Sequence, residues 1–157
     1  LIAAVITAVI FARVKGINFW SLADLASPGV ILGQAIGRWG NFINQEAYGT
    51  PTDLPWGIMV DGVKVHPTFL YESLWNFSVF AVLLWYRKRK KAEGNVFLLY
   101  LVLYSVGRFF VEGLRTDSLM LGNIRMAQLV SALAVAAGLG YMYYRNKDKK
   151  GTNTTSE

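Results

Sequence analysis

Long apolar segments separated by short polar ones dominate the sequence. An α-helix needs roughly 20 residues to cross the hydrocarbon core of a membrane. The pattern predicts a partial first span at 1–13 and complete or nearly complete spans near 27–45, 69–86, 95–113 and 122–144. We therefore predict an all-α polytopic membrane protein with about four complete transmembrane helices, one partial helix and a small exterior β-hairpin.

Local signals refine the boundaries of these elements. Ser27 and Pro28 suit the N-cap and the first turn of the second span. The pair Asp61-Gly62 stands between two apolar triplets at 58–60 and 63–65, which predicts the hairpin. We expect residues 1–145 to form the transmembrane domain and 146–157 to form a cytoplasmic tail, whose polar end at 153–157 has nothing to bury.

The beginning of the chain is also informative. It opens with Leu1 inside an apolar run, and Arg13 and Lys15 follow that run, whereas a signal peptide carries its positive charges first. We expect this run to be the trailing part of a longer span, and the chain to be the carboxy-terminal part of a longer protein.

Composition and charge support a membrane protein. Hydrophobic residues make up 54% of the chain and charged residues 17%, against about 25% charged in a typical soluble domain. The formal net charge of +6 lies mainly in two clusters, 87–91 and 145–150, each of which follows an apolar run that ends in aromatic residues. This pattern is typical of cytoplasmic anchors beside an aromatic belt, and it makes nucleic-acid binding a poor explanation.

The positions of the basic residues also predict orientation. Arg13 and Lys15, then 87–91, then 145–150 are separated by pairs of spans, so all would be cytoplasmic, whereas 46–68 and 114–121 would face the exterior. The sequence has no cysteine, which excludes disulfides, thiolate metal sites and a cysteine nucleophile. Any thiol in the chemistry must therefore arrive on a substrate.

The second span combines small and polar residues. Glycines recur at Gly29, Gly33 and Gly37, with Gly40 three residues further on, a spacing that lets membrane helices approach closely. Polar side chains are predicted to share one stripe of the same helix; they are Gln34, Arg38, Asn41 and Gln45. Packing is the favoured interpretation for the first two glycines. Polar and ionisable residues at membrane depth usually mark a site that handles a polar ligand, although an arginine can also snorkel to the headgroups.

A further cluster lies in the span near 95–113. Five residues at helical spacing share one face: Tyr100, Tyr104, Arg108, Glu112 and Arg115. Glu112 is one turn from both arginines, so an Arg-Glu-Arg cluster can form in which the carboxylate orients a guanidinium. Two interpretations stay open: a structural ion pair, and an anion site, which the surplus positive charge and the phosphate-matching shape of guanidinium favour.

A third set of polar residues opens the span near 69–86. His66, the sole histidine, lies at the exterior boundary, followed by Tyr71, Glu72 and Asn76. Histidine side chains titrate near neutral pH, so His66 is the most available proton acceptor in the chain, although a lone histidine is more often structural. Glu72 and Asn76 are one turn apart and suit either a functional role or the cross-linking of helices.

Residues 37–49 read Gly-Arg-Trp-Gly-Asn-Phe-Ile-Asn-Gln-Glu-Ala-Tyr-Gly, and this stretch closely resembles the signature of the prolipoprotein diacylglyceryl transferases. The matching positions are Gly37, Arg38, Gly40, Asn41, Phe42, Asn44, Glu46 and Gly49. Later motifs of that family match in the right order at His66-Pro67, Tyr71-Glu72, Gly107-Arg108, Glu112 and Arg115. The resemblance extends over essentially the whole chain except its polar tail.

The resemblance implies a function. Members of this family transfer diacylglyceryl from phosphatidylglycerol to the lipobox cysteine of a preprolipoprotein in the bacterial inner membrane, and need no metal or nucleotide cofactor. By resemblance, Arg38, Asn41 and Arg108 form the essential set. His66 is our candidate proton acceptor, and the substrate-binding candidates are Gly37, Gly40, Asn44, Glu46, Gly49, Tyr71, Glu72, Tyr104, Glu112 and Arg115.

The chain also departs from the family pattern. It lacks the family's amino-terminal part, including a His-Gly-Gly motif and the periplasmic head region, so the isolated chain is expected to depend on the longer protein for activity. Two other interpretations are a transporter or channel segment with an anion-binding arginine cluster, and a purely structural membrane subunit. The first would require Arg38 and Arg108 to line a continuous aqueous path.

Overall fold

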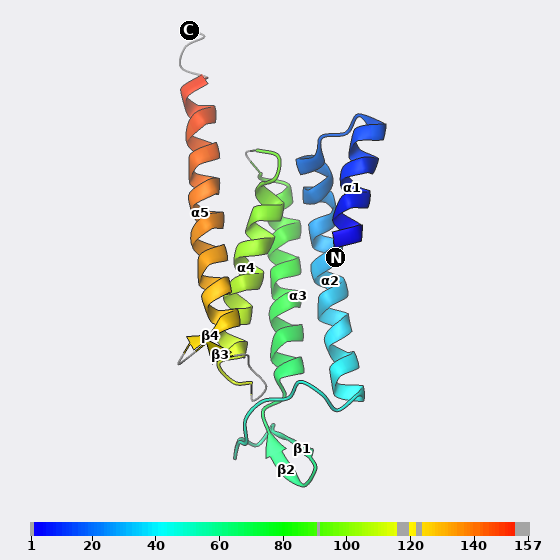
Figure 1. The fold of residues 1–157 in the computed structure, drawn as a ribbon, viewed down its shortest axis with the longest axis vertical. Coiled ribbons are helices and arrows are strands. Elements are labelled where there is room, and N and C mark those ends of the chain that lie inside the picture. The colour runs from blue at the N-terminus through cyan, green and yellow to red at the C-terminus, as the bar shows by residue number, and fades with distance from the viewer. Residues whose placement is uncertain (1, 91, 116–119, 122–123, 153–157) are drawn as a thin grey trace.

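The computed structural model describes residues 2–90, 92–115, 120–121 and 124–152, and these are mainly helical. The helices are α1 (Ile2–Lys15), α2 (Phe19–Ile43), α3 (Thr68–Arg87), α4 (Asn95–Glu112) and α5 (Met126–Thr152). The strands are β1 (Ile58–Val60), β2 (Val63–Val65), β3 (Met120–Leu121) and β4 (Ile124–Arg125). Figure 1 shows the helices running side by side, with the strands gathered at one end.

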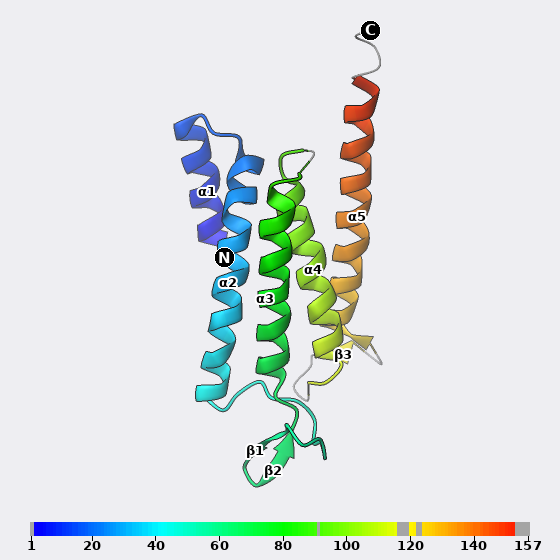
Figure 2. The same cartoon turned by 180° about the vertical axis from the view of Figure 1, so that it is seen from behind.

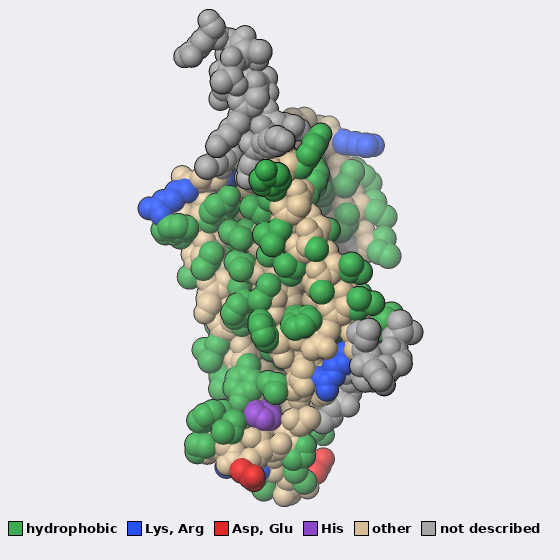
Figure 3. All heavy atoms as spheres, turned by 90° about the vertical axis from the view of Figure 1, so that its left-hand side faces the viewer, with side chains coloured by type: hydrophobic (Ala, Val, Ile, Leu, Met, Phe, Trp, Pro, Cys, Tyr) green, Lys and Arg blue, Asp and Glu red, His purple; other side chains and the backbone are tan. Residues whose placement is uncertain are grey.

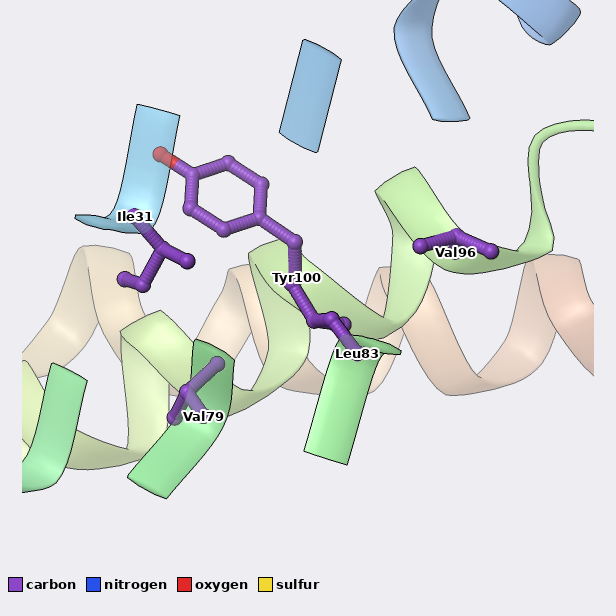
Figure 4. Close-up of a cluster of buried hydrophobic side chains, with 5 residues drawn as sticks. All are labelled: Ile31, Val79, Leu83, Val96 and Tyr100. Carbon is purple, nitrogen blue, oxygen red and sulfur yellow. The ribbon is translucent and has the colours of Figure 1, made fainter. Parts of the chain in front are cut away.

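The helices pack in an order that brings three of them together. α3 packs against both α2 and α4, α5 packs against α4, and α1 contacts α2. Figure 2 shows the same order from behind. A buried apolar cluster joins the three central helices through Ile31 of α2, Val79 and Leu83 of α3, and Val96 and Tyr100 of α4 (Figure 4). Between helices surrounded by lipid, such contacts stabilise through close van der Waals packing.

The second helix begins earlier than the sequence predicted. Asn18 is the N-cap of α2, and its side chain accepts a hydrogen bond from the Trp20 backbone N–H at 2.8 Å. Ser27 and Pro28 lie inside the helix, and the Ser27 hydroxyl donates to the Ala23 carbonyl at 2.6 Å. The prediction that Ser27 and Pro28 begin the helix is therefore wrong, because an earlier Asx cap satisfies the free N–H groups first.

The glycines of α2 do not lie at a helix contact in the described part of the chain. A Cβ added at Gly29, Gly33, Gly37 or Gly40 would meet nothing within 4 Å. The packing interpretation of these glycines finds no support among the described residues. Gln45 also leaves the predicted polar stripe, because α2 ends at Ile43 and Gln45 has a left-handed backbone with φ of 53°.

The predicted hairpin is confirmed. β1 and β2 pair antiparallel, with Val60 opposite Val63, and Asp61 and Gly62 both have positive φ, as a type I′ turn requires. A second hairpin, in which β3 and β4 have two residues each, was not predicted. In the sequence, the Gly-Asn pair at 122–123 is a turn signal, but these residues were predicted to belong to the last span.

Within the described part of the chain, two helices are apolar and long enough to cross a membrane, α4 and the Met126–Tyr144 part of α5. Figure 3 shows apolar side chains over the middle of one face, with Lys and Arg toward both ends and Asp, Glu and His toward the lower end. The ends of α1 and α3 that carry Arg13, Lys15 and Arg87 lie opposite the hairpins, as does the end of α5 (Figure 1). The number of complete spans stays a prediction, and the predicted polar tail at 153–157 lies outside the described residues.

Candidate functional site

A single carboxylate joins the two arginines that the sequence singled out. Glu72 of α3 is 5% exposed. Its Oε2 lies 2.5 Å from Nε of Arg38 on α2, and its Oε1 lies 3.2 Å from Nη1 of Arg108 on α4. Because α3 packs between α2 and α4, residues far apart in the sequence meet at this carboxylate. We call Arg38, Glu72, Arg108 and Glu112 the arginine–glutamate cluster.

The fourth member of the cluster holds Arg108 along its own helix. Nη2 of Arg108 lies 2.6 Å from Oε2 of Glu112, one turn further along α4. The predicted contact between these two residues is confirmed. Two carboxylates therefore bind the two terminal nitrogens of one guanidinium, which restricts its rotation and orients its plane.

The cluster has as many positive as negative charges, but some of its guanidinium N–H donors have no acceptor among the described residues. Two arginines face two glutamates, and both guanidinium groups are about one-fifth exposed, whereas both carboxylates are buried. Arg38 uses Nε for its ion pair, so among the described residues its two terminal nitrogens have no partner. A planar pair of N–H donors of this kind matches two oxygens of a phosphate or a carboxylate.

A small cavity of about 10 Å³ adjoins the cluster between α3 and α4. Its lining residues are Glu72, Trp75, Asn76, Tyr104, Gly107, Arg108 and Val111. Gly107 is required here, because a Cβ would lie 2.3 Å from the indole of Trp75, whose Nε1 donates to the Leu103 carbonyl at 2.9 Å. Trp75 therefore crosses directly over the backbone of α4 and closes one wall beside Arg108.

Asn41 does not line this cavity. It lines a second, larger cavity of about 320 Å³ together with Glu46, Phe69 and residues of β1. Asn44 donates to Oε1 of Glu46 at 3.2 Å, and both side chains are exposed. The structure thus brings Arg38 and Arg108 to one carboxylate, whereas Asn41 and Glu46 face a separate space.

Gly49 has a packing role in the loop after α2. A Cβ there would lie 2.7 Å from Cβ of His66 and 3.0 Å from the Leu114 carbonyl oxygen. Gly49 also forms an isolated antiparallel bridge with Arg115. This close approach holds the loop against the beginning of α3 and the end of α4.

His66 and Tyr71 form a pair of their own. Nδ1 of His66 lies 3.3 Å from the Tyr71 hydroxyl, which accepts a hydrogen bond from Trp56 Nε1 at 2.8 Å. Both residues lie near the hairpin end of α3, and among the described residues their side chains form hydrogen bonds with each other and with Trp56. The pair is therefore close to the arginine–glutamate cluster in sequence but makes no described contact with it.

Sequence reasoning missed two further charged residues with defined partners. Arg125 of β4 donates through Nη1 to the backbone carbonyl of Glu112, so the second hairpin closes over the end of α4. At the other end of the bundle, Asp24 is 2% exposed and accepts from Lys90 Nζ at 3.0 Å and from the Gly94 and Phe97 backbone N–H groups at 2.8 and 2.9 Å. An aspartate inside an apolar helix was the signal for the second site.

These features define a helical protein in which a buried carboxylate joins two arginines from separate helices. The chain belongs to the prolipoprotein diacylglyceryl transferase family, whose sequence model matches residues 1–144. This match favours the transferase interpretation over a transporter, a channel or a structural subunit.

Several curated relatives are closely similar. The Clostridioides difficile (strain 630) protein is 59% identical over 150 residues, covering 95% of this chain and 60% of the relative. The Finegoldia magna protein is 56% identical over 140 residues (88% and 56%), and the Bacillus cereus (strain Q1) protein is 53% identical over 159 residues (94% and 59%). Each is named phosphatidylglycerol–prolipoprotein diacylglyceryl transferase. The chain thus spans about 60% of the length of the relatives it matches.

Proposed function

We propose that the protein containing this chain transfers diacylglyceryl from phosphatidylglycerol to the cysteine thiol of a prolipoprotein. Family membership supports the reaction class, and the shared carboxylate of Glu72 is the observation that supports the site. It holds Arg38 at 2.5 Å and Arg108 at 3.2 Å, so two guanidinium groups can act on one anionic headgroup. No metal or nucleotide is part of this proposal.

In the proposed reaction, the cysteine sulfur attacks the glycerol carbon that is bonded to the phosphate oxygen. A carbon–sulfur bond forms, the carbon–oxygen bond breaks, and glycerol phosphate leaves with the bonding electrons. The terminal nitrogens of Arg38 bind the phosphate, and Arg108, oriented by Glu72 and Glu112, stabilises the charge that develops on it. The cluster is held in place before the substrate arrives, so little reorganisation is needed in the transition state.

The thiol must lose a proton in this reaction. We assign that proton to His66, the sole histidine of the sequence, because a neutral imidazole has a ring nitrogen that can accept a proton. The Tyr71 hydroxyl, 3.3 Å from Nδ1 of His66, orients the ring. Asn41 and Glu46 line the second cavity and would contact the substrates, and Asn44 donates a hydrogen bond to Glu46.

We also propose an arrangement in the bacterial membrane. The helices span it, the hairpins and the arginine–glutamate cluster lie toward the exterior, and the carboxy terminus is cytoplasmic. The basic residues Arg13, Lys15 and Arg87 at the opposite end of the bundle support this orientation.

The test uses the full-length protein in vesicles that contain phosphatidylglycerol, with a labelled diacylglyceryl group and a lipobox peptide. Arg108→Lys keeps the positive charge but loses the planar fork, so transfer should fall at least about tenfold. Arg87→Lys, an exposed residue at the other end of α3, is the matched control and should retain full transfer. Equal activity of the wild type and Arg108→Lys would contradict the proposed role of that guanidinium.

A further inference from the structure

The larger cavity has the character of a ligand site that is separate from the arginine–glutamate cluster. It has a volume of about 320 Å³ and lies where the end of α2, the following segment and β1 meet. Phe42, Phe69 and Met59 contribute apolar surface, and Asn41, Gln45 and Glu46 contribute polar atoms. A mainly apolar lining with a few polar groups is typical of sites that bind an organic ligand.

The segment that lines this cavity has an unusual backbone. Gln45 and Ala47 are not glycines, yet they have φ of 53° and 58°. Thr68 donates through Oγ1 to the Ala47 carbonyl at 2.6 Å and holds the segment against the beginning of α3. Left-handed backbone at non-glycine residues persists only where the surroundings impose it, and such positions cluster at ligand sites.

The cavity also borders a strand edge that is open among the described residues. The β1–β2 hairpin has a two-residue loop, so the pair that flanks the loop, Val60 and Val63, is hydrogen-bonded. Hydrogen-bonded and non-hydrogen-bonded pairs alternate along an antiparallel ladder. The backbone groups of the next pair, Met59 and Lys64, therefore point outward. Lys64 follows this rule, because its carbonyl accepts from the Thr52 N–H at 2.9 Å on the outer side of β2. The N–H and C=O of Met59 therefore point away from β2, along the outer edge of β1.

The charge of the lining indicates which of the two proposed substrates, the phospholipid or the prolipoprotein, this cavity binds. Glu46 is a carboxylate, and the lining includes no lysine or arginine among the described residues, so an anionic headgroup is disfavoured here. The relatives' name gives two substrates, a phospholipid and a prolipoprotein. The phospholipid phosphate fits the arginines, which leaves the peptide for this cavity.

We propose that this cavity binds a short extended segment of the prolipoprotein by strand addition to the outer edge of β1. The backbone of the peptide pairs with Met59, and an apolar side chain packs against Phe42 and Phe69. Asn41 lies one turn from Arg38 on α2, so the peptide would lie beside the phosphate site. This assignment rests on the proposed function and names the position of its second substrate.

The first test measures binding directly, with the full-length protein in detergent and a fluorescent peptide that carries apolar residues before its cysteine. Met59→Pro removes one edge N–H and leaves the β1–β2 ladder intact, because that N–H is not part of the ladder. The Kd of the peptide should rise about tenfold, as expected for the loss of one peptide hydrogen bond. Met59→Leu keeps the N–H and an apolar side chain of similar size and is the matched control, with a change in Kd below about threefold. The KM for phosphatidylglycerol should be unchanged in both variants.

A second measurement does not depend on a proline variant. A photo-crosslinking residue at position 59 should capture the peptide, whereas the same residue at Val63 of β2, also exposed, should not. Unchanged peptide binding by Met59→Pro, no capture at position 59, or displacement of the peptide by glycerol phosphate would each overturn the assignment. Peptide binding at this edge without any transfer would overturn the proposed function and leave the peptide site standing.

Discussion

Oε2 of Glu72 lies 2.5 Å from Nε of Arg38, and this ion pair connects α3 to α2. Glu72 contacts Arg108 with its other oxygen, so one buried carboxylate offsets the repulsion between two guanidinium groups. Such an arrangement costs desolvation energy, and it is stable only while every member has a partner. Loss of Glu72 should therefore affect both the fold and the site.

Glu72→Gln should destabilise the bundle and abolish most transfer. The amide keeps the shape but places an NH₂ group against one guanidinium, so the free energy of unfolding should fall by about 3 kcal/mol. Denaturation in detergent micelles measures the first effect, and labelled-lipid transfer measures the second. Glu93→Gln, an exposed residue at the other end of the bundle, is the control and should change neither. Wild-type stability of Glu72→Gln would show that the shared carboxylate contributes little.

Arg38 and Arg108 should act as a unit. If both hold one departing phosphate, Arg38→Ala and Arg108→Ala should each cost about 100-fold in transfer, and the double variant should cost little more. A kinetic cycle in the reconstituted full-length protein measures this, with folding followed separately. Losses in log rate that add in the double variant would indicate two independent sites.

Asp24 should stabilise the fold without affecting the chemistry. Its buried carboxylate caps the beginning of α4 through the Gly94 and Phe97 N–H groups and pairs with Lys90. Asp24→Ala leaves these donors unpaired, so the free energy of unfolding should fall by about 2–4 kcal/mol. Transfer per folded molecule should be retained, because the α3–α4 connection lies at the end opposite the hairpins (Figure 1). Asp53→Ala, an exposed residue in the loop before β1, is the control for loss of a carboxylate.

Gly107 should tolerate no side chain. Gly107→Ala places a Cβ 2.3 Å from the Trp75 indole, so Trp75 must move and its hydrogen bond to Leu103 is lost. We expect a loss of about 1–3 kcal/mol in the free energy of unfolding, together with reduced transfer. Gly140→Ala on α5 has open space around the added Cβ and is the matched control. Equal stability of the two variants would show that Trp75 has room to shift.

The proposed orientation can be tested with topology reporters. A reporter fused after Lys91 or Lys150 should read cytoplasmic, and one inserted at Asp61, in the β1–β2 turn, should read exterior, because basic residues are retained on the cytoplasmic side. The readouts are the activities of reporters that function on only one side of the membrane. The reverse pattern would invert the helices and place the arginine–glutamate cluster at the inner leaflet.

Several features were determined by the sequence alone because their causes are local. Apolar length placed α3 and α4 within a residue or two of their observed limits, and Asp61-Gly62 specified the type I′ hairpin through its positive φ values. The Arg108–Glu112 contact followed from helical spacing, since residues four apart lie on one face. The candidate arginines were visible for a similar reason: a charge within an apolar segment is costly wherever the helices pack.

The tertiary structure decided which of these residues meet. Spacing along α2 grouped Arg38 with Asn41, but packing against α3 joins Arg38 to Glu72 and turns Asn41 toward the larger cavity. Asp24 became a cap for α4 only because α2 and α4 are neighbours, a contact 70 residues apart in sequence. α2 begins at Phe19 because Asn18, and not Ser27, caps the free N–H groups at the beginning of the helix. Local propensity describes each helix separately, whereas ion pairs and caps between helices depend on their mutual rotation and order, which only packing determines.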